Sequence, residues 1–121
     1  MKLLDEMFHV ISDDGRQTVL RLNEAHPIYA IHFPGTPITP GVCIVQLLGE
    51  LLARRGGCDM ELVRIVNLKY VQTITPEGNP LLTVDFSSVA TTAEGIHAKG
   101  IMSLNGQVAT KFSLIFREKQ S

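Results

Sequence analysis

The chain has 121 residues, a formal net charge of -1 and a sequence pI near 6.4. This length suits one domain, so we expect a single domain over residues 1–121. The near-neutral charge, without any block of like charges, argues against nucleic acid as a partner. Acidic residues interrupt the N-terminal region and no apolar run approaches about 18 residues, so we expect a cytoplasmic protein without a signal peptide or membrane span.

Two cysteines, Cys43 and Cys58, form neither a CxxC motif nor a disulfide framework, so we expect both to be reduced thiols, with Cys43 in the core. The histidine, cysteine and acidic residues show no metal-ligand spacing, and no glycine-rich phosphate loop is present. The sequence therefore implies no metal and no other cofactor.

Most of the chain has the alternating or β-branched pattern of strands. An early pair of short runs flanks the turn sequence Asp13-Asp14-Gly15, which predicts a β-hairpin. Asn105-Gly106 is the strongest hairpin signal in the chain and predicts a second one. The expected strands cover residues 7–12, 16–22, 62–74, 81–90, 96–104 and 107–117.

One helix is expected, at about residues 41–55. Arg54 and Arg55 suit its last turn, and Gly56-Gly57 suits its end. Its apolar residues cover most of the circumference, which predicts a buried helix. The sequence therefore predicts an α+β fold, in which an antiparallel sheet of about six strands curls around one central helix. The exposed edges of such a sheet favour dimerisation.

The helix is preceded by a rigid loop, His32-Phe33-Pro34-Gly35-Thr36-Pro37-Ile38-Thr39-Pro40-Gly41. Proline fixes the backbone and glycine permits unusual conformations, so this loop can hold a histidine in one orientation. The first turn of the helix leaves N–H groups without intrahelical partners. An imidazole beside a helix N-terminus is a plausible chemical site.

The motif His32-Phe33-Pro34-Gly35-x-Pro37-x-x-Pro40-Gly41-Val42 resembles the signature of the β-hydroxyacyl-[acyl carrier protein] dehydratases. The segments Leu68-Lys69-Tyr70, Thr75-Pro76-Glu77-Gly78 and Asn105-Gly106-Gln107-Val108-Ala109 are similar to later parts of the same family. The resemblance implies the hot-dog fold and dehydration of a (3R)-3-hydroxyacyl thioester to the trans-2-enoyl product. It also implies acyl carrier protein or coenzyme A as the carrier, and a homodimer or a larger assembly of dimers.

The resemblance assigns two roles within the motif. His32 would remove the proton from C2 of the substrate, since a neutral imidazole is a suitable base near pH 7. The amide of Gly41 would hold the thioester carbonyl, where the helix dipole favours developing negative charge. The remaining contacts with the substrate would come from Phe33, Pro40, Val42 and Val45.

The chain departs from the family pattern at the position of the acid. Gln46 occupies the site where the family has Glu or Asp, and a carboxamide has no proton to give at a useful pKa. Glu50 lies one turn later on the same helical face and is a candidate acid. The alternative is a polar stripe in which Glu50 pairs with Arg54.

Three functions follow from these alternatives. The leading one is dehydration in fatty-acid-type or polyene biosynthesis, with His32, Gln46 and Glu50 as catalytic residues. The second is an acyl thioesterase of the same fold that uses Glu50. The third is a non-catalytic acyl-binding protein or a heterodimer partner.

Overall fold

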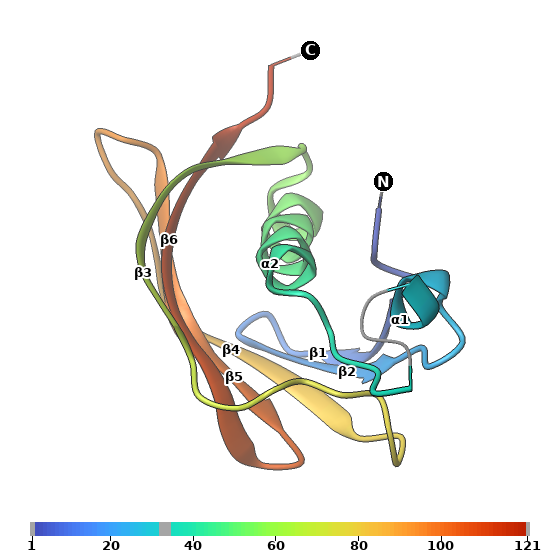
Figure 1. Ribbon diagram of the computed structural model, residues 1–121. Helices are drawn as coiled ribbons and strands as arrows, with labels where there is room; N and C mark the ends of the chain where they lie inside the picture. The colour runs from blue at the N-terminus through green and yellow to red at the C-terminus, as the bar shows by residue number, and fades with distance from the viewer. Residues whose placement is uncertain (1, 32–34, 121) are drawn as a thin grey trace.

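The computed structural model of this protein describes residues 2–31 and 35–120 (Figure 1). The elements in chain order are β1 (Phe8–Asp13), β2 (Gln17–Leu22), α1 (Pro27–Ile31), α2 (Gly41–Gly56), β3 (Met60–Tyr70), β4 (Leu81–Thr91), β5 (Ile96–Leu104) and β6 (Gln107–Glu118).

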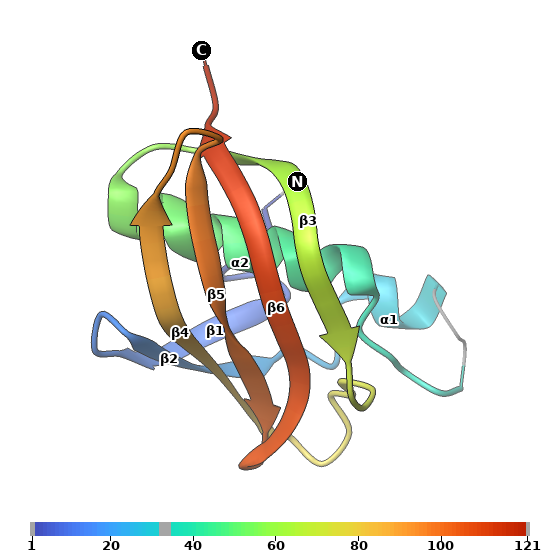
Figure 2. The ribbon, with the colours of Figure 1, turned by 90° about the vertical axis from the view of Figure 1, so that its left-hand side faces the viewer.

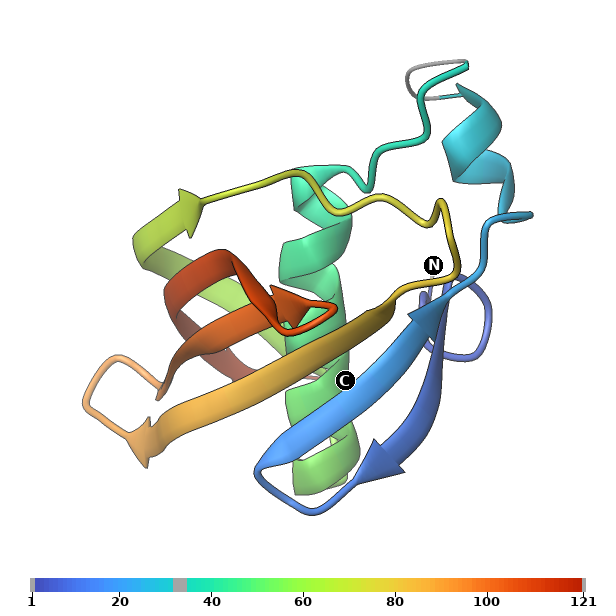
Figure 3. The same cartoon turned by 90° about the horizontal axis from the view of Figure 1, so that it is seen from below.

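The six strands form one antiparallel sheet in the order β1-β2-β4-β5-β6-β3, which leaves β1 and β3 at its edges. The sheet curls around α2, which lies on its concave side (Figures 1 and 2). The view from below shows the strands crossing the helix obliquely (Figure 3). A curled antiparallel sheet around one central helix is the hot-dog fold, so the predicted fold class is confirmed.

Helix α2 follows the limits that its sequence predicts. Pro40 has extended backbone angles at the N-cap, and Gly57 adopts the left-handed conformation at the C-cap, with φ of 77°. The Gly57 N–H donates to the Ala53 carbonyl and so satisfies one of the last helical oxygens. The helix ends at Gly56, one residue beyond the predicted end at Arg55.

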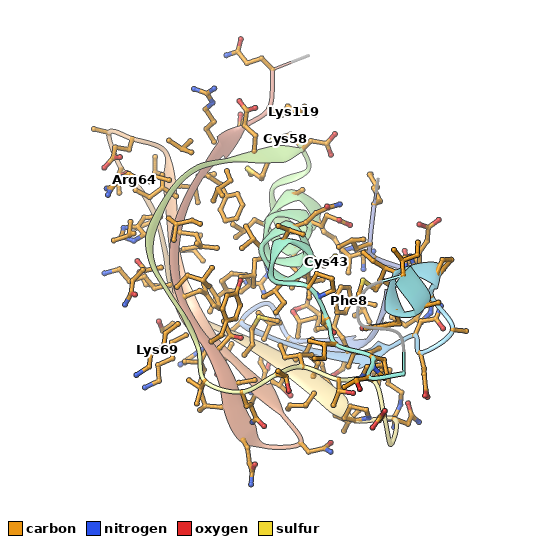
Figure 4. All side chains as sticks on the ribbon, in the orientation of Figure 1. Phe8, Cys43, Cys58, Arg64, Lys69 and Lys119 are labelled. Carbon is orange, nitrogen blue, oxygen red and sulfur yellow. The ribbon has the colours of Figure 1, made fainter. Side chains whose placement is uncertain are left out.

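The buried side of α2 packs into the hydrophobic core. Its buried side chains include Cys43, Ile44, Leu47, Leu48, Leu51 and Leu52, and each buried aliphatic side chain contributes about 1.5–3 kcal/mol of transfer free energy. Figure 4 shows Cys43 and Phe8 inside the fold, whereas Arg64 and Lys69 point away from α2. The expectation of a helix buried all round is wrong at Val42, whose exposed fraction is 77%.

The strand expected over residues 62–74 begins earlier and ends earlier, at Met60 and Tyr70. Beyond Tyr70 the chain leaves the regular ladder, although the Val71 and Gln72 N–H groups still donate to the Ala109 carbonyl. Ile74 is buried and packs in the core, which explains why its apolar pattern resembles a strand.

The short helix α1 was not predicted. It spans only Pro27–Ile31, and five residues are too few for a helical period to show in the sequence. Proline is well suited to a first helical position because its missing N–H would have no partner there. The His26 Nδ1 accepts a hydrogen bond of 3.2 Å from the Ile28 N–H and helps to start the turn.

The Asn105-Gly106 turn joins β5 to β6 as predicted. Both residues have positive φ, 48° and 82°, as a type I′ turn requires. The first predicted hairpin is also present, because β1 pairs with β2 across the turn at residues 14–16.

Candidate functional site

The loop before α2 is fixed at both of its ends. His32, Phe33 and Pro34 lie outside the described residues, so the predictions on His32 and Phe33 stay predictions. On either side, the Tyr29 hydroxyl of α1 and the Thr39 hydroxyl are 2.8 Å apart, and both side chains are buried. The Thr39 N–H also donates to the Ile74 carbonyl, at 2.8 Å. Burial raises the pKa of Tyr29 to about 12, so the phenol is neutral.

The start of α2 presents unpaired backbone donors. The Pro40 carbonyl accepts hydrogen bonds from the N–H groups of Cys43 and Ile44, at 3.0 and 3.2 Å. The N–H groups of Gly41 and Val42 have no acceptor among residues 2–31 and 35–120. These two groups therefore remain as donors for a ligand oxygen, as the resemblance implies for Gly41.

Tyr70, at the end of β3, lies against this helix start. A Cβ atom on Gly41 would be 2.5 Å from the Tyr70 hydroxyl oxygen and 3.0 Å from Cζ. Burial raises the pKa of the Tyr70 phenol, which keeps the hydroxyl protonated at neutral pH. A side chain at position 41 would therefore collide with the Tyr70 hydroxyl unless the ring moved.

A groove of about 910 Å³ runs between α2 and β3. From α2 it is lined by Gly41, Val42, Val45, Gln46, Gly49, Glu50 and Ala53. At a rise of 1.5 Å per residue, Gly41 and Ala53 lie about 18 Å apart along the helix. The groove walls are largely apolar near Gly41 and in the middle, while Lys2, Asp59 and Lys119 supply charges at other parts of its rim.

Glu50 is held by hydrogen bonds from the N-terminal segment. The Leu3 N–H is shared between both carboxylate oxygens at 2.9 Å, and the Leu4 N–H donates to Oε1 at 2.9 Å. The Gln46 Nε2 donates to Oε2 of the same carboxylate at 3.0 Å. Gln46 and Glu50 therefore form one hydrogen-bonded pair that faces the groove.

The predicted alternative pairing of Glu50 with Arg54 is wrong. The Arg54 guanidinium instead lies 3.2 Å from the Asp5 carboxylate, and within the described ranges no ion pair joins it to Glu50. The N-terminal segment, which the sequence pattern left unassigned, occupies the space where that pair would form.

The structure brings most of the predicted site residues together. Gly41, Val42, Val45, Gln46 and Glu50 all line the groove, and Pro40 caps the helix that carries them. Sequence reasoning missed Tyr70 and Leu3 as neighbours of the site. Tyr70 belongs to a quoted motif segment, so a signal existed for it, but nothing in the sequence links Leu3 to a residue 47 positions away.

Strand β3 exposes apolar side chains along its whole length. The exposed fractions are between 41% and 49% for Leu62, Val63, Ile65, Val66 and Tyr70. β3 is an edge strand of eleven residues, so its backbone groups on one side have no partner strand. A long apolar edge of this kind is a template for pairing with another chain.

Within residues 2–31 and 35–120, no three histidine, cysteine or acidic side chains come together as a metal-binding group. Both cysteines are free thiols, with Cys43 buried as predicted. Among the described helices, none is long and apolar enough to cross a membrane.

Comparisons with known proteins agree with this geometry. A protein-family profile described as "ApeI-like: ApeI dehydratase" matches residues 9–100. The chain is 28% identical over 130 aligned residues to the 3-hydroxyacyl-[acyl-carrier-protein] dehydratase FabZ of Enterococcus faecalis, which covers 94% of this chain and 84% of that protein. Identity to FabZ of Rhizobium rhizogenes is also 28%, over 81 residues, and that match spans about half of the relative, 52%.

Solved structures show the same fold. The dehydratase heterocomplex ApeI:P from Xenorhabdus doucetiae matches with a TM-score of 0.65 and 15% identity, covering 91% of this chain and 95% of that one. A hypothetical thioesterase from Streptococcus pneumoniae, solved with coenzyme A, matches with a TM-score of 0.57 and 10% identity, covering 94% and 88%. At these identities the likeness concerns the fold alone.

Proposed function

The chain belongs to the ApeI-like dehydratase family, and on this basis we propose that it dehydrates (3R)-3-hydroxyacyl thioesters to trans-2-enoyl thioesters. The carrier is acyl carrier protein or coenzyme A, and the pathway is fatty-acid-type or polyene biosynthesis. The observation that carries the proposal is the groove along α2 that begins at the open N–H groups of Gly41 and Val42.

The reaction breaks the C2–H and C3–O bonds and forms the C2–C3 double bond, with water as the second product. His32 takes the proton from C2 as a neutral base. Negative charge then develops on the thioester oxygen, where the Gly41 and Val42 N–H groups and the helix dipole stabilise it. The acyl tail lies in the groove against Val42 and Val45, and a contact with Phe33 stays a prediction from the resemblance.

The leaving hydroxyl must receive a proton. We assign the binding of this hydroxyl group to the pair of Gln46 and Glu50. Gln46 contacts the hydroxyl group, and Glu50 fixes the Gln46 amide through the 3.0 Å hydrogen bond. A carboxamide positions a hydroxyl but does not protonate it. The proton therefore comes from Glu50 through a water molecule, for which the Glu50 carboxyl group must first carry a proton, or from a group outside this chain.

One observation favours a second candidate function. The Glu50 carboxylate already accepts hydrogen bonds from Leu3, Leu4 and Gln46, which suits a structural role more than proton transfer. In this case the chain would be the base-bearing half of a heterodimer whose other subunit supplies the acid. The similar structure from Xenorhabdus doucetiae is a dehydratase heterocomplex, which supports the idea.

The exposed edge of β3 supports a dimer in either case. We propose that two hot-dog subunits pair through this strand in the cytoplasm, as a homodimer for the first candidate and as a heterodimer for the second. Burial of the apolar side chains of β3 would provide the free energy of association.

The test is incubation of the purified protein with a 3-hydroxyacyl-coenzyme A, following enoyl absorbance and free thiol in parallel. Enoyl formation that His32→Ala abolishes would support dehydration, and thiol release without enoyl product would instead show a thioesterase. If the protein binds the substrate but forms neither product alone, the assay is repeated with candidate hot-dog subunits that carry an acid at the position of Gln46. Product only in the mixture would support the heterodimer.

A further inference from the structure

The N-terminal segment is the least expected part of the site, because nothing in the sequence connects it with α2. Leu3 is fully buried in the core, and its carbonyl accepts hydrogen bonds from the N–H groups of Glu6, Met7 and Phe8. Asp5 adds the ion pair with Arg54. Figure 1 shows the segment beside α2, away from β3.

Glu50 is the side chain that joins this segment to the helix. Its two oxygens accept hydrogen bonds from the N–H groups of Leu3 and Leu4 at 2.9 Å, and hydrogen bonds to a charged group are stronger than those between neutral groups. The Glu50 side chain thus accepts hydrogen bonds from two backbone groups and from the Gln46 amide. Glu50 therefore holds the N-terminal segment against α2.

Two hollows meet beside the anchored segment. The groove of about 910 Å³ and a neighbouring hollow of about 330 Å³ share Lys2, Glu50, Ala53 and Asp59 as lining residues. The second hollow is lined as well by Leu4 and Asp5 of the segment. The shared residues lie in the half of the groove away from Gly41, where the distal part of an acyl chain would lie.

We propose that Glu50 is a positioning residue that holds residues 2–4 in place, so that Lys2 closes the end of the groove and limits the length of the acyl group. This inference rests on the proposed function for the identity of the ligand. It assigns Glu50 a role in selecting the substrate and leaves the transfer of the proton to other groups. Releasing the segment would move Lys2 away from this end of the groove and let a longer chain extend along Ala53 and Met60.

The test uses Glu50→Gln, which keeps the size of the side chain but places an amide N–H₂ opposite the N–H donors of Leu3 and Leu4. Glu24→Gln is the matched control, because it makes the same charge change at an exposed position after β2. Leu4→Pro removes one donor while leaving Glu50 intact. The probes are butyryl-, octanoyl-, dodecanoyl- and palmitoyl-coenzyme A, which have no 3-hydroxyl group and cannot be dehydrated.

We expect Glu50→Gln to raise the affinity for the longest probes relative to octanoyl-coenzyme A by about tenfold, which corresponds to about two more buried methylene groups. Leu4→Pro should shift the preference in the same direction by less, and Glu24→Gln should leave it unchanged. Amide hydrogen exchange at Leu3 and Leu4 should become faster in Glu50→Gln. A loss of stability alone would not change the length profile, that is, the relative affinities for probes of different chain length.

An unchanged length profile in Glu50→Gln, with folded protein, would overturn the proposal. So would the absence of binding of any probe to the wild type. Loss of dehydration at every chain length in Glu50→Gln, with normal activity in Leu4→Pro, would show that Glu50 is the acid and would also overturn it. The binding series does not depend on turnover, so a wild type that binds these probes but forms no enoyl product from 3-hydroxyacyl-coenzyme A would contradict the proposed dehydration alone.

Discussion

The hydroxyl group of Tyr70 occupies the space that a side chain on Gly41 would need, with only 2.5 Å between the hydroxyl oxygen and the position of a Cβ atom. The end of β3 and the start of α2 are therefore fitted to one another at the place where the thioester carbonyl is proposed to bind. Because the two residues are 29 positions apart, this fit depends on the folded structure.

Gly41→Ala should displace the Tyr70 ring and lower kcat/KM for dehydration by about one order of magnitude, or about 1.4 kcal/mol in the barrier. Combining it with Tyr70→Ala should relieve the collision, so the two changes should not be additive in a double-mutant cycle. Additive effects would show that the loss in Gly41→Ala comes from the helix start itself and not from the tyrosine.

Tyr29→Phe should loosen the base of the loop that carries His32. It leaves the buried Thr39 hydroxyl without its 2.8 Å partner, which costs about 1–3 kcal/mol in the free energy of unfolding. We expect lower stability in urea and reduced dehydration. Tyr70→Phe is the control for stability, because its phenol is half exposed.

The buried phenol of Tyr29 also predicts that the stability of the fold depends on pH. Burial raises the pKa of Tyr29 from 10.0 to about 12 in the folded state. The neutral phenol therefore makes its full contribution to the free energy of unfolding below pH 10. Between pH 10 and 12 the phenol ionises in the unfolded chain but not in the folded one, and stability should fall by less than about 3 kcal/mol. Urea unfolding across this range should show the fall in the wild type and a smaller one in Tyr29→Phe.

Gln46→Glu should restore an acid at the position where the family has one. The new carboxyl group would lie within hydrogen-bonding distance of Glu50, so the two would share a proton and the higher apparent pKa of the pair would be raised. We expect dehydration to increase at least about tenfold and to decline as the pH rises through that pKa. Gln107→Glu, at an exposed position, is the control, and an unchanged rate would favour an acid supplied by another subunit.

Gly49→Ala should destabilise the fold although alanine is the better helix former. An added Cβ atom would lie 2.9 Å from Cε1 of the buried Phe116 ring, and overpacking of this kind costs about 1–3 kcal/mol. Gly56→Ala is the matched control at the exposed end of α2, where the nearest atom is the flexible end of Met60 at 3.3 Å. Equal urea midpoints for the two variants would contradict the predicted close packing.

Val66→Lys should weaken the proposed dimer at the edge of β3. Val66 is 42% exposed in the single chain, and a lysine on an edge strand opposes pairing with another strand. We expect the dissociation constant to increase about tenfold or more in sedimentation or light scattering. Ile101→Lys, on the central strand β5 with an exposed fraction of 37%, should leave the mass unchanged.

The local sequence was sufficient for the six strands and the long helix of the fold. The pair Asn105-Gly106 fixes a turn because both residues tolerate positive φ, and Gly57 ends α2 for the same reason. Hydrophobic periodicity placed the long helix and all six strands, since each pattern reports on burial of one face. It could not place α1, which is shorter than two helical turns.

The family resemblance, together with helical spacing, also identified the groove residues Gly41, Val42, Val45, Gln46 and Glu50. It did not determine what Glu50 contacts. An i, i+4 pair with Arg54 is a local possibility, yet Asp5 binds the arginine and the backbone of Leu3 binds the glutamate. Contacts between residues so distant along the chain arise only when the fold is complete.

The sequence by itself therefore determined the family, the fold and the face of α2 that lines the groove, since these depend on local conformation and on a motif of neighbouring residues. Only the tertiary structure decided the surroundings of that face, namely the Tyr70 ring on Gly41, the Phe116 ring on Gly49 and the N-terminal segment on Glu50. The physical reason is that hydrogen bonds and close packing between distant residues depend on the positions of whole elements, which no local pattern encodes.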